Sequence, residues 1–349
     1  MRTCCLFVFI FIVNNTGFSQ SQTVGTFLND SESFDGYTLF APDYYNSTYL
    51  INNCGELINE WTSNLTPGLS AYLLPDGSLI RCGRTNNSTF SAGGTGGLIE
   101  RYSWNNELVW NYEYSSDNFH QHHDIEYLPN GNVLLLAWEK ITIDEVIAAG
   151  RDPNNLGDEF WSEKIVEIQP IGLNDALVVW EWRAWDHLIQ EFDFTKENFG
   201  LVQEHPELID LNYTIPIAPG PGNGLVDWLH CNSIDYNQTL DQIMITSHNF
   251  SELWIIDHST SIEEAAGHSG GQYGKGGDLL YRWGNPQTYD RGTSFSQKLF
   301  LPHDAHWINE NSPDANKIMI FNNGVGRDIP SYSSVDVIDP AINVNGEYI

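Results

Sequence analysis

The chain has 349 residues and a formal net charge of −31 at pH 7, with 15 Lys and Arg residues against 46 Asp and Glu residues. Proteins that bind nucleic acid neutralise phosphates with Lys and Arg, so this charge argues against a nucleic-acid partner. Hydrophobic residues make up 41% of the chain, including 12 Trp, 16 Tyr and 17 Phe, which is ample for a large folded core and argues against disorder.

The first 19 residues have the features of a secretory signal sequence. Arg2 precedes an apolar run at positions 4–13, and Gly-Phe-Ser stands directly before Gln20. The run is shorter than the roughly 20 apolar residues that a membrane-spanning helix requires. We therefore expect residues 20–35 to be a leader, residues 36–349 to form one folded domain, and the protein to be periplasmic or secreted, without a membrane span.

Short runs of strand-forming residues alternate with turn signals from Tyr49 onward. Two hairpins are predicted first, at 49–61 around Gly55 and at 71–81 around Pro75-Asp76-Gly77. The same unit of four strands recurs at 97–137, 164–246 and 252–321, and a fifth unit begins at Ser334.

A four-stranded unit that repeats about every 50 residues is typical of a β-propeller. The units share a tryptophan position whose rings we expect to fill the space between blades: Trp61, Trp110, Trp180 and Trp283. The predicted fold class is all-β, a β-propeller of four-stranded blades, with a β-sandwich or two unrelated β domains as the alternative. Because the fifth unit is cut short, we expect the chain to be truncated after about four and a half blades.

Two insertions interrupt the repeats, at 141–163 and 183–226, and contain the only helix-compatible stretches, such as Asp186–Phe192. Insertions at equivalent places of a propeller gather on one face, which is often the binding face. The Gly-rich segment 267–277 is interpreted as a flexible loop, since it lacks the strand and helix that flank a phosphate-binding loop. A disulfide between Cys54 and Cys82 is left open, because spacing alone does not establish it.

Three histidines occupy a shared place in the repeat. His123, His230 and His303 each precede the second hairpin of a unit, which predicts that their imidazoles converge near the central channel. Two chemistries suit such a site: binding of a divalent metal with help from Asp124 or Asp304, or nucleophilic attack by an imidazole on sulfur or phosphorus. The histidines alone do not decide between them.

Several phrases together resemble the bacterial aryl-sulfate sulfotransferase family, and the resemblance runs from about Gly36 to the end of the chain. They are residues 121–125 with 129–132, residues 227–233, residues 251–260 continuing to 276–286, and residues 303–308. The resemblance implies a six-bladed propeller in the periplasm that moves a sulfuryl group from an aryl sulfate ester to a phenol by a ping-pong reaction through a sulfohistidine. The implied partners are thus a small-molecule donor and acceptor, and no nucleotide donor, cofactor or metal is implied.

By motif, His303 matches the family's nucleophile. His230 and the pair His122-His123, with His123 preferred, match the histidines that bind sulfate oxygens and assist proton transfer at the phenolic oxygen. Asn232 in the second phrase is expected to bind substrate.

One position departs from the family, which usually has Ser-Ser-Arg where this chain has Thr246-Ser247-His248. Arginine offers a permanent charge and a planar fork of donors, whereas histidine offers a partial charge and at most two donors. We expect His248 to bind substrate, with Arg282 or Arg327 as a substitute cation or with a lower pH optimum. The alternatives are an impaired or non-catalytic propeller that binds an anion or metal at the same histidines, and a metal-dependent hydrolase.

Overall fold

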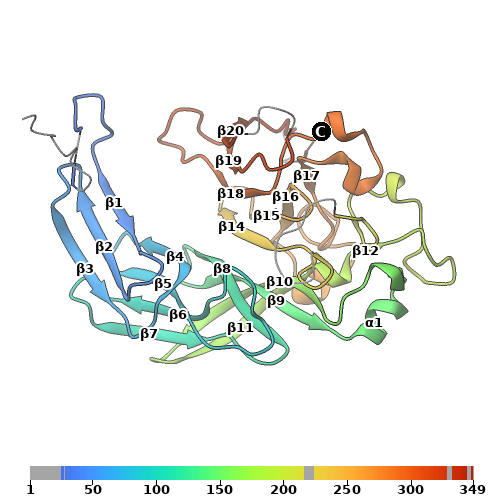
Figure 1. Cartoon of the computed structure of the whole chain (residues 1–349), viewed down its shortest axis with the longest axis horizontal. Helices are drawn as coiled ribbons and strands as arrows, with labels where there is room; N and C mark the ends of the chain where they lie inside the picture. The colour runs from blue at the N-terminus through green and yellow to red at the C-terminus, as the bar shows by residue number, and fades with distance from the viewer. Residues whose placement is uncertain (1–24, 27, 216–223, 328–331, 344–346, 349) are drawn as a thin grey trace, which may run out of the picture.

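The structure is a computed structural model that describes residues 25–26, 28–215, 224–327, 332–343 and 347–348. Five antiparallel sheets follow one another around an arc, with the N-terminal and C-terminal sheets at its two ends (Figure 1). The predicted signal sequence lies outside the described residues. In the part that is described, no helix is long and apolar enough to cross a membrane.

Each sheet is a meander in which strands adjacent in sequence pair with one another. The first sheet contains β1 (Tyr37–Phe40), β2 (Ser47–Asn52) and β3 (Leu57–Thr62). The second contains β4 (Pro67–Leu73), β5 (Leu79–Arg84), β6 (Gly97–Tyr102) and β7 (Leu108–Glu113). The third contains β8 (Phe119–Tyr127), β9 (Val133–Ile141), β10 (Phe160–Ile171) and β11 (Asp175–Arg183). The fourth contains β14 (Cys231–Asn237), β15 (Gln242–Ser247), β16 (Glu252–Asp257) and β17 (Tyr281–Trp283), and the fifth contains β18 (Pro302–Trp307), β19 (Ile318–Asn322) and β20 (Ser334–Ile338).

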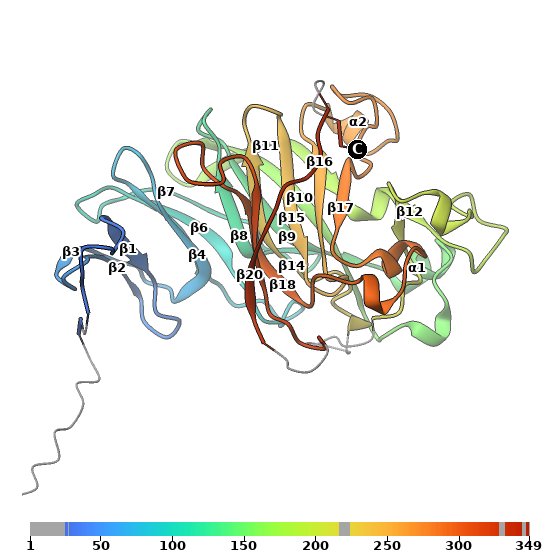
Figure 2. The ribbon, with the colours of Figure 1, turned by 90° about the horizontal axis from the view of Figure 1, so that it is seen from above.

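Helices are few and short, and those of the insertions gather at one end of the molecule. Among the described residues, the α-helices are α1 (Ile143–Ala148) and α2 (Ile262–Ala265), and the 3-10 helices include η1 (Pro153–Asn155), η2 (Ala184–Asp186), η3 (Val202–Glu204), η5 (Pro286–Tyr289) and η6 (Ser294–Ser296). The stretch Asp186–Phe192, expected to be helical, instead leaves η2 and enters β12 (Leu188–Ile189), which pairs in parallel with β13 (Ile209–Asp210). Figure 2 shows α1 and β12 together at the end of the molecule away from β1–β3.

The all-β propeller is confirmed, but the predicted blade boundaries were two strands out of phase. The hairpins at 49–61 and 71–81, assigned to one unit, belong to different sheets, because β3 ends one sheet and β4 begins the next. Turn signals mark every hairpin alike and do not reveal which hairpins share hydrogen bonds. The five sheets replace the expected four and a half units, and the first and last have three strands each among the described residues.

Tryptophans on the last strands of three sheets tie each sheet to the next. The indole N–H of Trp61 donates to the carbonyl of Ser103 (2.9 Å), and that of Trp110 donates to the carbonyl of Asp175 (3.0 Å). The indole N–H of Trp180 donates to Oγ1 of Thr260, at 3.1 Å. For Trp61, Trp110 and Trp180, the expectation that the rings lie between blades is therefore confirmed, and each contact also satisfies a buried indole donor.

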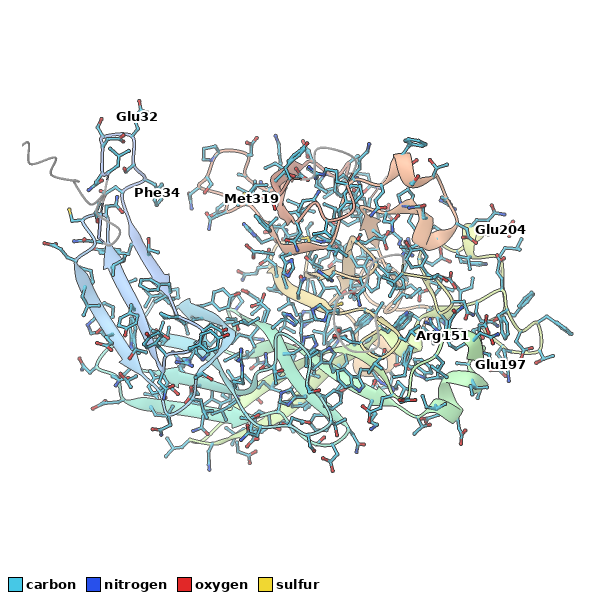
Figure 3. The ribbon with its side chains drawn as sticks, in the orientation of Figure 1. Glu32, Phe34, Arg151, Glu197, Glu204 and Met319 are labelled. Atoms are coloured by element: carbon cyan, nitrogen blue, oxygen red, sulfur yellow. The ribbon has the colours of Figure 1, made fainter. Side chains whose placement is uncertain are left out.

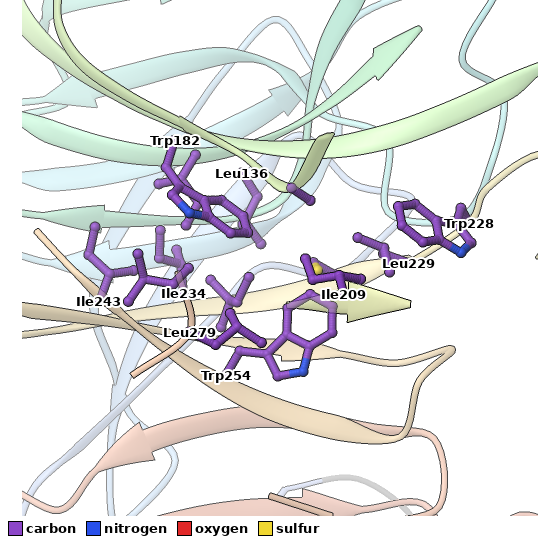
Figure 4. Close-up of a cluster of buried hydrophobic side chains, with 14 of the residues drawn as sticks. Leu136, Trp182, Ile209, Trp228, Leu229, Ile234, Ile243, Trp254 and Leu279 are labelled. Atoms are coloured by element: carbon purple, nitrogen blue, oxygen red, sulfur yellow. The ribbon is translucent and has the colours of Figure 1, made fainter. Parts of the chain in front are cut away.

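The largest hydrophobic cluster fills the space between the third and fourth sheets (Figure 4). Leu136 and Trp182 contribute from the third sheet, and Ile243 and Trp254 contribute from the fourth. All four side chains are fully buried. Because each of the two sheets buries one face in this cluster, their first strands, β8 and β14, are held at fixed positions relative to each other.

The first strands of the last four sheets, β4, β8, β14 and β18, pack beside one another in that order. Each has a register shift against the second strand of its sheet, at Pro67/Ala71, Gln121/Ile125, Cys231/Ile234 and His303/His306, and the last three shifts fall at phrases singled out in the sequence. A β-bulge re-aims side chains and releases backbone groups from the ladder. The backbone N–H of Ile234 donates to Asp124 at 3.1 Å, and that of Trp307 donates to Asp235 at 2.6 Å, so carboxylates join neighbouring inner strands.

Candidate active site

Five imidazoles form a continuous row across the inner strands of three sheets. The ring centroids of His122 and His123 lie 5.1 Å apart, those of His123 and His230 4.8 Å, those of His230 and His248 5.1 Å, and those of His248 and His303 5.2 Å. His122 and His123 belong to β8, His230 and His248 flank β14 and β15, and His303 belongs to β18. The structure thus brings together every histidine that the sequence placed in the site.

The backbone at two of these histidines adopts a left-handed conformation. The φ angles are 50° at His123 and 48° at His230. Such a conformation is uncommon for residues other than glycine and costs free energy that the surrounding fold must offset, and it recurs at functional sites. Gly94 permits this arrangement, because a Cβ at its position would collide with the imidazole of His123.

His230 forms a dyad with Asp227, which sequence reasoning missed. Nδ1 of His230 makes a short hydrogen bond to Oδ2 of Asp227, and Oδ1 of Asp227 accepts a bond from the indole N–H of Trp138 at 3.1 Å. Burial opposes protonation of His230, but the Asp227 carboxylate outweighs it and raises the pKa of the imidazole. Asp227 stands three residues before His230 in the same phrase, so its position was visible in the sequence although its role was not.

A second chain of hydrogen bonds runs from Glu163 to the pair His122-His123. Oε2 of Glu163 lies 2.8 Å from Nε2 of His122, and Nδ1 of His122 lies 2.8 Å from Nδ1 of His123. The other oxygen of Glu163 accepts the backbone N–H of Cys231 at 2.9 Å. Burial raises the pKa of Glu163 well above its usual value and lowers that of His122 to about 3, so the carboxyl holds the proton that the two groups share.

The orientation of His248 is set by Asn249. The side-chain amide of Asn249 donates to the carbonyls of Asp227 (2.8 Å) and Trp228 (3.3 Å), which leaves its oxygen facing Nδ1 of His248 at 3.0 Å. That nitrogen must therefore donate, and in the neutral ring Nε2 carries a lone pair. Burial lowers the pKa of His248 to about 3, so this ring is neutral in the ligand-free site.

His303 and Asn232 both have buried polar atoms without a partner among the described residues. These atoms are Nδ1 of His303 and the side-chain oxygen of Asn232, while the amide nitrogen of Asn232 donates to the carbonyl of Pro302 at 2.9 Å. Burial, followed by the neighbouring His230, lowers the pKa of His303. Unsatisfied buried atoms in a polar site indicate a place where a ligand completes the hydrogen bonding.

In the structure, the two predicted substitute cations have partners other than the histidines of the row. Arg282 lies on β17, the last strand of its sheet, where its guanidinium contacts both oxygens of Glu252 at 3.2 Å and donates to Oγ1 of Thr288 at 2.9 Å. Arg327 donates to Ser334 at 3.1 Å. Arg282 is therefore engaged by a buried carboxylate rather than brought to the histidine row. The positive charge that the geometry supports within the row is that of His230.

The cysteines are not paired in the described residues. Cys54 is exposed in the turn between β2 and β3, whereas Cys82 is buried in β5 of the next sheet. The sequence had left this disulfide open.

Comparisons with known proteins bear on the fold and on the family. No curated protein matches the chain. Among solved structures, a protein of unknown function from Bacteroides caccae is similar at 9% identity, over 90% of this chain and 78% of that one, with a TM-score of 0.42. A calcium-binding protein, regucalcin, from Agrobacterium tumefaciens is similar at 8% identity, over 90% and 69% of the two chains, with a TM-score of 0.39. Likenesses this weak carry no argument about function.

The comparison with protein families matches most of the chain, including the candidate active site. The arylsulfotransferase (ASST) family matches residues 47–336, which include all five histidines of the row as well as Glu163 and Asp227. With most of the chain matched and the histidine phrases gathered into one site, this protein belongs to the arylsulfotransferase family.

Proposed function

We propose that the protein is an exported arylsulfotransferase that carries the sulfuryl group transiently on His303, in a ping-pong reaction between an aryl sulfate ester and a phenol. The observation that supports this best is the pairing of opposite pKa shifts in one row. His303 is neutral and nucleophilic, whereas His230 is held ready as an acid by Asp227. Groups whose environments push their pKa values apart are suited to divide nucleophilic and acid roles.

In the first half-reaction, a free ring nitrogen of His303 attacks sulfur, and the bond between sulfur and the aryl oxygen breaks. The leaving phenolate takes a proton from the imidazolium of His230, which becomes neutral. In the second half-reaction, an acceptor phenol gives its proton back to His230 while its oxygen attacks sulfur, and the bond between nitrogen and sulfur breaks. His303 and His230 then return to their starting states.

Asn232 and the remaining histidines of the row stabilise the charge on the sulfuryl oxygens. Asn232 contributes its side chain beside Pro302, and His123 is connected through His122 to the proton held by Glu163. An anion next to His248 raises the pKa of that imidazole and turns its Nε2 into a donor, so this charge arrives together with the substrate. A fixed arginine at the same place would not need this step.

The proposal is tested by incubating the full chain with p-nitrophenyl sulfate and phenol and measuring nitrophenol release. We expect His303→Ala to abolish release and His306→Ala to retain it, because His306 bonds the backbone of Asp304 and lies outside the row. Equal release by both variants would remove His303 from the nucleophilic role. No release by the unaltered protein between pH 5 and 9 would favour the alternative, a propeller that binds an anion at the same row without turnover, for which the neutral His248 is the motivating observation.

A further inference from the structure

A second group of histidine and carboxylate side chains lies outside the histidine row. One ring nitrogen of His187, one of His268 and a carboxylate oxygen of Asp278 lie within 4.8 Å of one another. Nδ1 of each histidine is 2.8 Å from Oδ1 of Asp278. His187 belongs to the second insertion, whereas His268 lies within the Gly-rich segment 267–277 and Asp278 directly follows it, so the group joins two segments that are distant in sequence.

The hydrogen bonds of His187 leave a conflict that a cation resolves. Nε2 of His187 lies 2.9 Å from the carbonyl oxygen of Ala265, which can only accept, so this nitrogen must carry a proton. In the neutral ring, Nδ1 then presents a lone pair to a carboxylate oxygen of Asp278. Two acceptors at 2.8 Å repel each other unless a proton or a metal ion lies between them.

Packing holds this arrangement in place. The ring of His187 is fully buried and stacks on the indole of Trp182, with centroids 5.6 Å apart and planes 6° apart. A Cβ at Gly277 would collide with the imidazole of His187 and the carbonyl of Ala265. The Gly-rich segment, interpreted from the sequence as a flexible loop, therefore requires glycine for close approach to a histidine.

One member of the group, His268, lines a cavity. The cavity, of about 700 Å³, is lined by residues of the second insertion, by Ala148 and Ala149 of the first, and by His268, whose side chain is 60% exposed. Asp186 and Glu197 lie in the same wall. Figure 3 shows Glu197 and Glu204 on the insertion at the end of the molecule opposite Glu32 and Phe34.

We propose that His187, His268 and Asp278 form a binding site for a divalent transition-metal ion, with Zn²⁺ the best fit. Two imidazole nitrogens and one carboxylate oxygen are a donor set typical of zinc sites that keep an open position, with bonds of about 2.0 to 2.2 Å. The bond from Nε2 of His187 to a backbone carbonyl is the outer contact that a ligating histidine usually makes. A bound ion would fix the Gly-rich segment to the second insertion and so shape the cavity.

The test uses the metal-stripped full chain. Zn²⁺ is titrated by calorimetry, and bound zinc is counted by elemental mass spectrometry after dialysis. We expect one high-affinity ion per chain, weakened at least about 100-fold by His268→Ala and by Asp278→Asn. The matched control is His205→Ala, which removes another histidine of the same cavity that pairs with Glu207 at 2.9 Å, and it should bind zinc as the unaltered protein does.

His303→Ala is the second control, because the histidine row could also bind zinc. Loss of zinc in that variant with full retention in His268→Ala would assign the ion to the row and overturn the proposal. Absence of zinc binding by the unaltered chain would also overturn it, and would mean that a second proton lies between His187 and Asp278. The exposed position of His268 makes a folding defect in His268→Ala unexpected, and a thermal melt verifies this.

Discussion

Asp227→Asn gives the sharpest test of the proton-transfer part of the reaction. The carboxylate is buried, accepts from Trp138 through one oxygen and bonds Nδ1 of His230 through the other. The amide can keep the bond from Trp138 with its oxygen, which turns its NH₂ group toward His230. Nδ1 of His230 must then accept rather than donate, and the imidazolium loses the charge that stabilises it.

The magnitude follows from the role assigned to His230. Loss of a positioned general acid lowers the rate by roughly 10²–10⁴. The pH profile should change as well. Asp227 raises the pKa of His230, so the imidazole stays protonated at pH values above the ordinary pKa of histidine. Activity therefore falls only as the pH rises through the raised pKa. Without the carboxylate, burial becomes the largest influence on His230 and lowers its pKa, so the falling limb of the profile moves to lower pH.

The assay is nitrophenol release across pH 5 to 9, with kcat and KM determined separately. Asp257→Asn is the matched control, since Asp257 is an equally buried carboxylate that bonds Ser259 and the backbone of Tyr273 rather than a histidine. A melting curve for each variant separates misfolding from lost chemistry. The reasoning is refuted if Asp227→Asn keeps the alkaline limb in place and turns over at the rate of the unaltered protein.

Three further predictions concern the positive charge at position 248 and two buried ion pairs that stabilise the fold. His248→Arg should raise kcat by up to about 10²–10³, because it supplies a fixed donor to the sulfuryl oxygens; unchanged or lower turnover in a folded variant would contradict this. Arg282→Met should lower the free energy of unfolding by about 3–5 kcal/mol in urea, because it leaves Glu252 buried and unpaired, and should leave the pH profile unaltered. His258 bonds Glu167 at 2.9 Å, and although burial opposes its charge, its carboxylate partners raise its pKa. The stabilisation is therefore complete below about pH 6.5 and lost as the pH rises through the folded pKa, so His258→Gln should destabilise at pH 5 and have little effect at pH 9.

Local patterns predicted much of the fold. Turn triplets such as Pro75-Asp76-Gly77 marked the hairpins correctly, since Gly77 adopts a φ of 82° and Asp76 accepts the N–H of Ser78 at 2.9 Å. The spacing of Trp61, Trp110 and Trp180 indicated the contacts between blades. The blade boundaries were missed because hydrogen bonding between hairpins depends on which edges meet in space, and no residue at the turns records that.

The sequence likewise identified some residues of the candidate site and missed others. His123, His230 and His303 could be found because they recur at one place in the repeat, and His248 because it stands where the family has arginine. Glu163 could not be found, since it lies on β10 within a run of buried residues and reaches His122 only through the packing of neighbouring strands. The role of Arg282 was also not visible in the sequence, because a buried ion pair and a substrate-binding arginine have the same appearance there.

The central claim is that the sulfuryl group passes through His303, and trapping that intermediate tests it most directly. The full chain is mixed with p-nitrophenyl sulfate without an acceptor, quenched rapidly under alkaline conditions and analysed by intact mass and peptide mapping. The account predicts an added mass of one sulfuryl group on the peptide that contains His303, removed by phenol and absent from His303→Ala. Release of nitrophenol without that added mass, or a sulfuryl group on a different residue, would contradict it.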